Sequence, residues 1–227
     1  MTLKTIAVIL QTVEETDRVL AFVLPLASRW GAHIIGIHAE PLAVDYSSGI
    51  GFPDVGVIQA ATEAAEQRTA AVAAAFSARM GPSTSHEWQS LNNIAGDGAS
   101  SSLSLARCAD LVVVAQRDPD SSGDGANLDS AIYESGRPVL VVPHDGAITG
   151  SFQRTLISWN GSREAARAAF DALPLLVEAE ATEIFTIDPD SHAEAAESAS
   201  ALAAALSRHG AKVSVTTTAS NGAALDE

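Results

Sequence analysis

The stretch Ala109-Asp110-Leu111-Val112-Val113-Val114-Ala115 decides the fold. Its apolar run has no polar residue on either face, which is typical of a strand that helices cover on both sides. A comparable run at Thr5–Leu10 opens the chain, and helical patterns separate the strands from one another. Because strands alternate with helices, the sequence predicts an α/β fold with a doubly wound parallel sheet joined by right-handed crossovers.

Five strands are predicted in the first part of the chain: Thr5–Leu10, His33–Ala39, Ser85–Leu91, Leu111–Val114 and Pro138–Pro143. Thr12 and Glu15 form a capping-box pattern that opens the first helix, and Gly31 is expected to end it. The five strands with their helices predict one complete domain over residues 1–146.

The same order of elements restarts after a short linker. A strand at Thr155–Ser158, a helix at Ser162–Val177 and a strand at Thr182–Ile187 are followed by a helix ending at His209-Gly210 and a strand at Lys212–Thr217. Thr5–Val8 and Thr155–Ser158 begin the two series. The sequence therefore predicts a partial second copy over residues 152–227.

A copy with three strands leaves part of its sheet without neighbours. We expect an open edge at Lys212–Thr217, which soluble proteins normally cover. The final residues, Ala223–Glu227, resemble the start of a further helix. This pattern favours a truncated second copy, and the alternative is an edge covered by the first domain or by another chain.

The composition excludes several classes of function. A formal net charge of -15 disfavours nucleic-acid binding, because an acidic surface repels phosphate backbones. The N-terminus lacks a signal-peptide pattern and no apolar run is long enough to span a bilayer, so we expect a cytoplasmic protein without membrane partners. The single cysteine, Cys108, precedes an apolar strand and is expected to be buried.

No motif in the sequence argues for catalysis. The six histidines are spread along the chain, and His33 and His38 lie at odd spacing on one strand, so no zinc site is expected. A Walker loop and a Gly-x-Ser-x-Gly elbow are both absent from the sequence. We therefore expect a non-enzymatic protein.

Three segments together resemble the universal stress protein family. They are Ser158–Ala166, Ala109–Val114 and Gly136–Pro143, in the order and spacing of that family. The resemblance implies an adenine nucleotide α-hydrolase-like sheet with a nucleotide pocket at the carboxyl ends of its strands. In ATP-binding members an acidic residue ends the first strand, and Gly-x2-Gly-x9-Gly-Ser/Thr follows the fourth.

The first domain departs from the pattern of ATP-binding members. Ala115 and Asp118 stand at the first two glycine positions, Gly125 at the third, and Ala126 at the hydroxyl position. The first strand ends at Gln11 rather than at an acid. Aspartates in the loop would repel a triphosphate. The first domain is therefore not expected to bind ATP in the family manner.

The same loop has a partial calcium-binding pattern. Asp118, Asp120, Ser122 and Asp124 alternate as calcium ligands do, and Gly123 stands at the turn position. The loop lacks the glutamate of an EF-hand at its twelfth position, where Asp129 stands, and a strand precedes it. A solvated polar loop is the default interpretation and a calcium site the alternative.

Candidate ligand-binding residues lie in the second copy. Asn160 takes the place of the acid, Gly161 allows close approach of a backbone, and Ser162 can cap a helix or touch a ligand. Asp188 ends the second strand of this copy, where the family resemblance places adenine contacts. A turn with an N-cap is the simpler interpretation of 160–162. ATP would be a cofactor only if a completed second domain supplied the phosphate loop.

Three functions remain open from the sequence. The resemblance implies a non-catalytic stress-response protein that acts as a small-molecule or nucleotide sensor or as an interaction module. The first alternative is an ATP-binding protein with slow ATPase activity through a completed second domain. The second is a structural module that forms a homodimer through the apolar strand Val139–Val142, where family members commonly pair.

Overall fold

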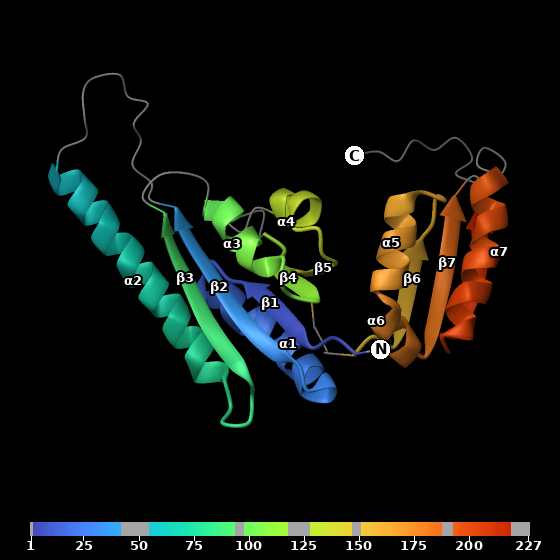
Figure 1. Cartoon of the computed structure of the whole chain (residues 1–227), viewed down its shortest axis with the longest axis horizontal. Helices are drawn as coiled ribbons and strands as arrows, with labels where there is room; N and C mark the ends of the chain where they lie inside the picture. The colour runs from blue at the N-terminus through green and yellow to red at the C-terminus, as the bar shows by residue number, and fades with distance from the viewer. Residues whose placement is uncertain are drawn as a thin grey trace, which may run out of the picture. The chain divides into compact units, whose positions relative to one another are not determined.

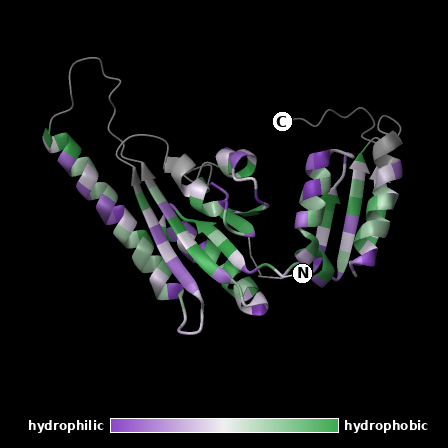
Figure 2. Cartoon of the chain, viewed as in Figure 1, coloured by the Kyte–Doolittle hydropathy of each residue, from purple (hydrophilic) through white to green (hydrophobic). Residues whose placement is uncertain are grey.

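The computed structural model describes residues 2–41, 55–93, 98–117, 128–146, 151–187 and 193–218. The chain divides into two compact units, one spanning Leu3–Gly150 and the other including Ser151–Glu227. Each unit has its own sheet and its own apolar core (Figures 1 and 2). The units are therefore described one at a time.

The first unit contains a five-stranded sheet in the order β3-β2-β1-β4-β5, and all neighbouring strands are parallel. The strands are β1 (Thr5–Ile9), β2 (His33–Pro41), β3 (His86–Asn93), β4 (Leu111–Ala115) and β5 (Val139–Val142). The predicted doubly wound α/β sheet is confirmed. Strand order reverses between β1 and β4, the position where such sheets bind ligands at their carboxyl ends.

Helices cover both faces of this sheet. They are α1 (Val13–Trp30), α2 (Val55–Arg79), α3 (Gly98–Ala106) and α4 (Leu128–Glu134). Leu103 and Ala106 of α3 and Ala131 of α4 share one buried cluster with residues of β1, β2 and β4. All five residues of β4 are buried, as its apolar sequence predicts.

Helix α1 has the ends that its sequence predicts. Thr12 and Glu15 form a complete capping box, and Gly31 ends the helix with a left-handed φ of 60°. Pro25 lies inside the helix without ending it. The N-cap at Thr12 fixes the point at which the chain passes from the carboxyl end of β1 into α1.

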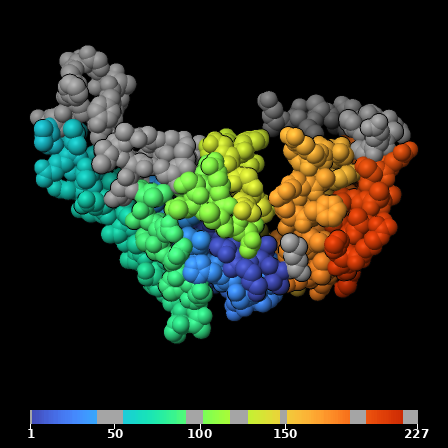
Figure 3. Space-filling view, viewed as in Figure 1, coloured from blue at the N-terminus to red at the C-terminus, as the bar shows by residue number. Residues whose placement is uncertain are grey.

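The second unit contains a three-stranded parallel sheet in the order β6-β7-β8. The strands are β6 (Arg154–Ser158), β7 (Ala181–Ile187) and β8 (Val213–Thr218), and the helices are α5 (Arg163–Asp171), α6 (Leu173–Glu178) and α7 (Ala193–Arg208). Residues of all three helices share one core with Trp159 and Ile184, so these helices pack on one face of the sheet. The space-filling view shows the residues of this unit in orange to red (Figure 3).

One predicted helix is in fact two. The helix expected over Ser162–Val177 is interrupted at Ala172, which ends α5 and precedes α6. Pro174 lies in the first turn of α6, where its missing N–H costs nothing, but it cannot continue the hydrogen-bond ladder of α5. The proline therefore explains the break.

Backbone hydrogen bonds show which residues of the two sheets correspond. Leu10 donates to the carbonyl of Ile37 at 2.9 Å, and Trp159 donates to that of Phe185 at 2.9 Å. Ile9 and Ser158, the residues before the donors, are therefore equivalent. By the same count Thr5 is equivalent to Arg154, and Thr155 is equivalent to Ile6.

The second sheet has two open edges among its described strands. The predicted edge at β8 is confirmed, and its residues are mostly exposed. The other edge is β6, which the sequence interpretation did not identify. It corresponds to β1, which lies between β2 and β4 in the first unit. The edge at β6 is therefore the one that lacks the neighbour found in the complete sheet.

Cys108 corrects a further expectation. Its side chain is exposed, not buried. Helix α3 ends at Ala106, and Cys108 and Ala109 lie in the turn that follows, with Ala109 taking the buried position. The turn before β4 thus points the thiol outward, although it directly precedes an apolar segment.

Candidate functional site

The carboxyl end of β1 is closed by a side chain of the first unit itself. One carboxylate oxygen of Glu15 accepts hydrogen bonds from the backbone N–H of Gln11 at 3.0 Å and of Thr12 at 3.3 Å. In return, Glu15 N–H donates to Thr12 Oγ1 at 3.1 Å. Glu15 is buried. Free N–H groups at a helix start attract anions, and here an internal carboxylate already occupies them.

Arg18 of α1 binds the residues that follow β4 and β5. Its Nη1 donates to the carbonyl of His144 at 2.9 Å, and its Nη2 donates to that of Gln116 at 3.2 Å. Gln116 Oε1 also accepts from His144 N–H at 3.3 Å. Gln116 follows β4 and His144 follows β5, so one guanidinium from α1 binds both exits. Both terminal nitrogens of the Arg18 guanidinium therefore donate to backbone carbonyls.

The phosphate-loop prediction can be followed only at its first position. Ala115 is the last residue of β4 and is buried. Asp118, Gly125 and Ala126, and the calcium pattern over Asp118–Asp124, lie outside the described residues. The structure therefore locates Ala115, which stands at the first glycine position, and does not describe the other three positions.

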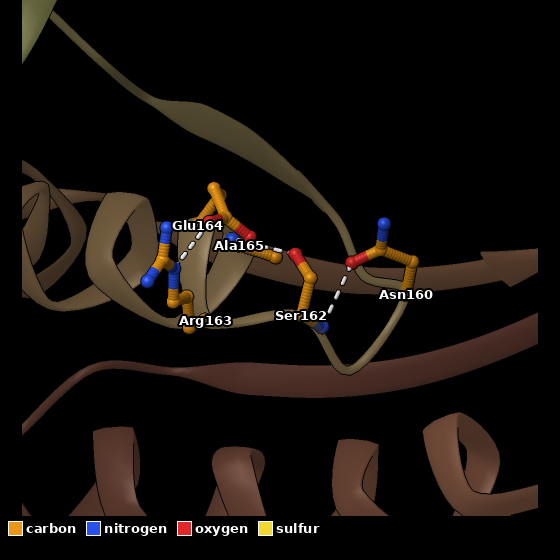
Figure 4. A network of polar contacts seen from close by, with 5 residues as sticks. All are labelled: Asn160, Ser162, Arg163, Glu164 and Ala165. Atoms are coloured by element: carbon orange, nitrogen blue, oxygen red, sulfur yellow. Dashed lines mark hydrogen bonds and ion pairs between the residues drawn. The ribbon is translucent and has the colours of Figure 1, made fainter.

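The candidate residues of the second unit form a tight turn between β6 and α5 (Figure 4). Asn160 Oδ1 accepts from Ser162 N–H at 3.0 Å, and Ser162 Oγ accepts from Ala165 N–H at 3.1 Å. Gly161 has φ of 77°, which favours glycine. Ser162 is the N-cap of α5. The turn therefore brings Asn160, Gly161 and Ser162 together.

These contacts decide what the turn can offer a ligand. The side-chain oxygens of Asn160 and Ser162 each accept a hydrogen bond inside the turn. The Asn160 side-chain nitrogen points away from the turn (Figure 4) and carries donors only. An acid at this position would accept hydrogen bonds, whereas Asn160 presents donors to a ligand. The interpretation as an N-capped turn accounts for both of these hydrogen bonds.

An exposed ion pair follows the turn. Arg163 Nε donates to Glu164 Oε1 at 2.6 Å. The hydrogen bond from Arg163 lowers the pKa of Glu164, and the hydrogen bond to Glu164 raises the pKa of Arg163. Both shifts favour the charged forms, so the pair carries one positive and one negative charge and adds no net charge at the start of α5.

The two units differ where the second strand of each sheet ends. In the first unit, His38 is fully buried, and its Nδ1 lies 2.7 Å from the carbonyl of Leu10. Thr186 takes the place of His38 in the second unit, and its buried Oγ1 has no hydrogen-bond partner among the described residues. Trp159 replaces Leu10, and its Nε1 donates to Ser198 Oγ at 2.9 Å. The cores under the two turns are therefore packed differently.

Other predictions about sites have simpler outcomes. Asp188, the remaining candidate, lies outside the described residues. Within the described ranges no group of three or more His, Cys, Asp or Glu side chains could hold a metal ion. His33 bonds Ser85 while His38 is buried, so the two histidines point to opposite faces, as their spacing predicts. No described helix is long and apolar enough to cross a membrane.

Glu15 and Arg18 are the site residues that sequence interpretation missed. The capping-box pattern identified Glu15 as a helix-start residue but not as the group that occupies the strand end. Nothing in the sequence indicates Arg18, because its partners are 98 and 126 residues away. Only the folded sheet brings these groups together.

Comparisons with known proteins support the fold. A scan against protein-family models found no match, and no curated protein matched the sequence. A universal stress protein from Archaeoglobus fulgidus DSM 4304 matches with a TM-score of 0.63 at 18% identity, over 95% of this chain and 76% of that one.

Two further solved structures match less closely. A putative universal stress protein from Pseudomonas aeruginosa UCBPP-PA14 has a TM-score of 0.49 at 13% identity, over 96% of this chain and 74% of that chain. A universal stress protein from Archaeoglobus fulgidus, solved in complex with dAMP, has a TM-score of 0.40 at 17% identity, over 63% of this chain and 99% of that one. The chain has the fold of the universal stress proteins.

Proposed function

We propose that this chain is a stress-response protein of the universal stress type that acts without catalysis, as a small-molecule sensor or interaction module. The shared fold over nearly the whole chain supports the family assignment. Fold alone does not determine function, so the proposal rests on the chemistry at the strand ends. That chemistry argues against ATP in the first unit.

The observation that carries this proposal is the closed end of β1. The Glu15 carboxylate occupies the amides of Gln11 and Thr12, and an incoming phosphate or ribose hydroxyl would have to displace it. Displacement would also leave the buried Glu15 carboxylate without its two N–H donors. Losing hydrogen bonds costs more free energy at a buried carboxylate than at an exposed one, because water does not replace them. The Glu15 carboxylate thus occupies the position at the end of β1 that a ligand would need.

Calorimetry with Mg·ATP tests the proposal. The chain is expected to give no saturable heat, which means a dissociation constant weaker than about 1 mM. Phosphate release should stay at the level of a protein-free control. Saturable heat with a constant near about 10 µM, or phosphate release above that control, would support the ATP-binding alternative instead.

We also propose that the chain forms a homodimer through β5. This strand ends the first sheet, and its residues Val139, Leu140 and Val141 are only half-buried. An apolar edge strand with unpaired backbone groups is a template for pairing with a second copy.

Light scattering after size exclusion tests the dimer. The expected mass is twice the 23.4 kDa of the chain at micromolar concentration. Leu140→Lys, which places a charge on the edge, should yield the monomer mass. A monomer from the unmodified chain would overturn the dimer and leave the sensor proposal intact.

A further inference from the structure

The turn between β6 and α5 contains an Asn-Gly pair that is open to solvent. Asn160 and Gly161 are both exposed. Asparagine is a thermolabile residue, because its side-chain amide carbon reacts with the backbone nitrogen of the residue that follows it. Glycine has no side chain to obstruct that reaction. The turn therefore holds both reacting groups of a spontaneous modification in one exposed place.

A hydrogen bond of the turn brings these two groups together. Ser162 N–H donates to Asn160 Oδ1 at 3.0 Å, which closes a ring through the Asn160 side chain and the Gly161 backbone (Figure 4). Asn160 Cγ and the Gly161 nitrogen are both members of this ring, so the ring keeps them close to each other. The φ of 77° at Gly161 is one that glycine adopts without strain. Holding two reacting groups in such a geometry accelerates their reaction.

The same hydrogen bond activates the Asn160 side-chain carbonyl. Attack at Cγ moves negative charge onto Oδ1, and the Ser162 N–H that already binds this oxygen stabilises the charge, as a donor in an oxyanion hole does. Helix α5 begins directly after Ser162, and the positive end of its dipole favours negative charge at this place. The developing charge on Oδ1 therefore has two sources of stabilisation.

The leaving group and the attacking nitrogen are both accessible to water. The side-chain nitrogen of Asn160 points away from the turn (Figure 4). Among the described residues, none accepts a hydrogen bond from this nitrogen or from Gly161 N–H. The Gly161 nitrogen must lose its proton to attack, and the side-chain nitrogen must gain one to leave as ammonia. Water can carry both protons at this exposed position.

We propose that Asn160 is a site of spontaneous deamidation. The Gly161 nitrogen loses its proton to water and forms a bond to Asn160 Cγ, and the bond from Cγ to the side-chain nitrogen breaks, which releases ammonia. A water molecule then opens the cyclic imide that results. Opening at Cγ leaves aspartate at position 160. Opening at the backbone carbonyl leaves isoaspartate, whose main chain is longer by a methylene group.

The two products differ in their effect on the turn. Aspartate keeps an oxygen that accepts from Ser162 N–H and adds negative charge at the start of α5, so this product retains the turn. It also presents an acceptor where Asn160 presents donors. Isoaspartate lengthens the main chain inside the hydrogen-bonded ring and opens the turn. The reaction needs no nucleotide, so its failure would leave the proposed function unaffected.

Peptide mapping by mass spectrometry of the full chain tests the proposal. Trypsin releases Thr155–Arg163 with this Asn-Gly pair, while the pair Asn221-Gly222 lies in a separate peptide. The chain is incubated at mildly alkaline pH beside a synthetic copy of Thr155–Arg163, which serves as the unfolded reference. We expect Asn160 to convert in the chain at least as fast as in the reference. Slower conversion in the chain would overturn the proposal. An unincubated sample measures conversion during digestion.

Two substitutions at Ser162 separate the role of its N–H from its role as N-cap. Ser162→Ala removes the cap oxygen and keeps the N–H, so conversion should stay close to that of the unmodified chain. Ser162→Pro removes both at a φ of -73°, which proline accepts, and should slow conversion at least about tenfold. Equal conversion in the two variants would also overturn the proposal. The comparison with the reference peptide remains decisive if circular dichroism shows that a variant does not fold.

Discussion

Ile184→Ala is expected to destabilise the second unit by about 2–5 kcal/mol while leaving the first unit unchanged. Ile184 lies in the middle of β7, is fully buried, and contributes to the core shared by α5, α6 and α7. Truncation removes its apolar contacts and leaves a cavity. The core of the first unit contains none of these residues. The loss should therefore stay within the second unit.

Hydrogen exchange measures that loss in each unit separately. Amides of β7 should exchange faster in Ile184→Ala, and amides of β1 and β4 should keep their rates. Leu156→Ala is the matched control, since Leu156 is largely exposed and its truncation should change stability by less than about 0.5 kcal/mol. Equal acceleration of β1 and β7 amides would show one cooperative core and contradict two independent ones.

Gly36→Ala is expected to destabilise the first unit by about 1–3 kcal/mol. A Cβ at Gly36 would lie 2.7 Å from Phe76 Cε2 and 2.7 Å from Trp88 Cε3. Phe76 is fully buried, and its ring centroid is 5.2 Å from that of Trp88. Neither ring can move without disturbing the other, so the added methyl group must strain the packing.

Denaturation followed by tryptophan fluorescence tests this effect, since Trp88 reports on the packing. Gly81→Ala is the control, because a Cβ there would meet only Thr84 Oγ1 at 3.6 Å, an ordinary contact. Its stability should stay within about 0.5 kcal/mol of the unmodified chain. A stable Gly36→Ala variant would show that the aromatic cluster can repack around the methyl group.

Much of the fold could be predicted from the sequence because periodicity reports burial directly. The run at β4 has no polar residue and proved buried throughout, and the capping box at Thr12 and Glu15 marks the start of α1. Errors arose where local pattern and chain geometry compete. Pro174 divides a helix whose apolar spacing continues across it, and Cys108 turns outward within an apolar context.

The candidate site was harder to predict because its contacts are long-range. The turn at Asn160–Ser162 was found from its residue types, since amide, glycine and hydroxyl in series favour an N-capped turn. Arg18 has no local signal, and the open edge at β6 follows from strand order rather than from the order of elements along the chain. Neighbours in a sheet are decided by crossovers, which periodicity does not report.

The closed end of β1 is the central claim, and amide NMR tests it most directly. Backbone signals of Gln11 and Thr12 would be followed while Mg·ATP is added to the intact chain. We predict no saturable shift of either signal up to about 1 mM ATP, because the Glu15 carboxylate retains both amides. A saturable shift of both signals would show that ATP displaces Glu15 and would contradict the account.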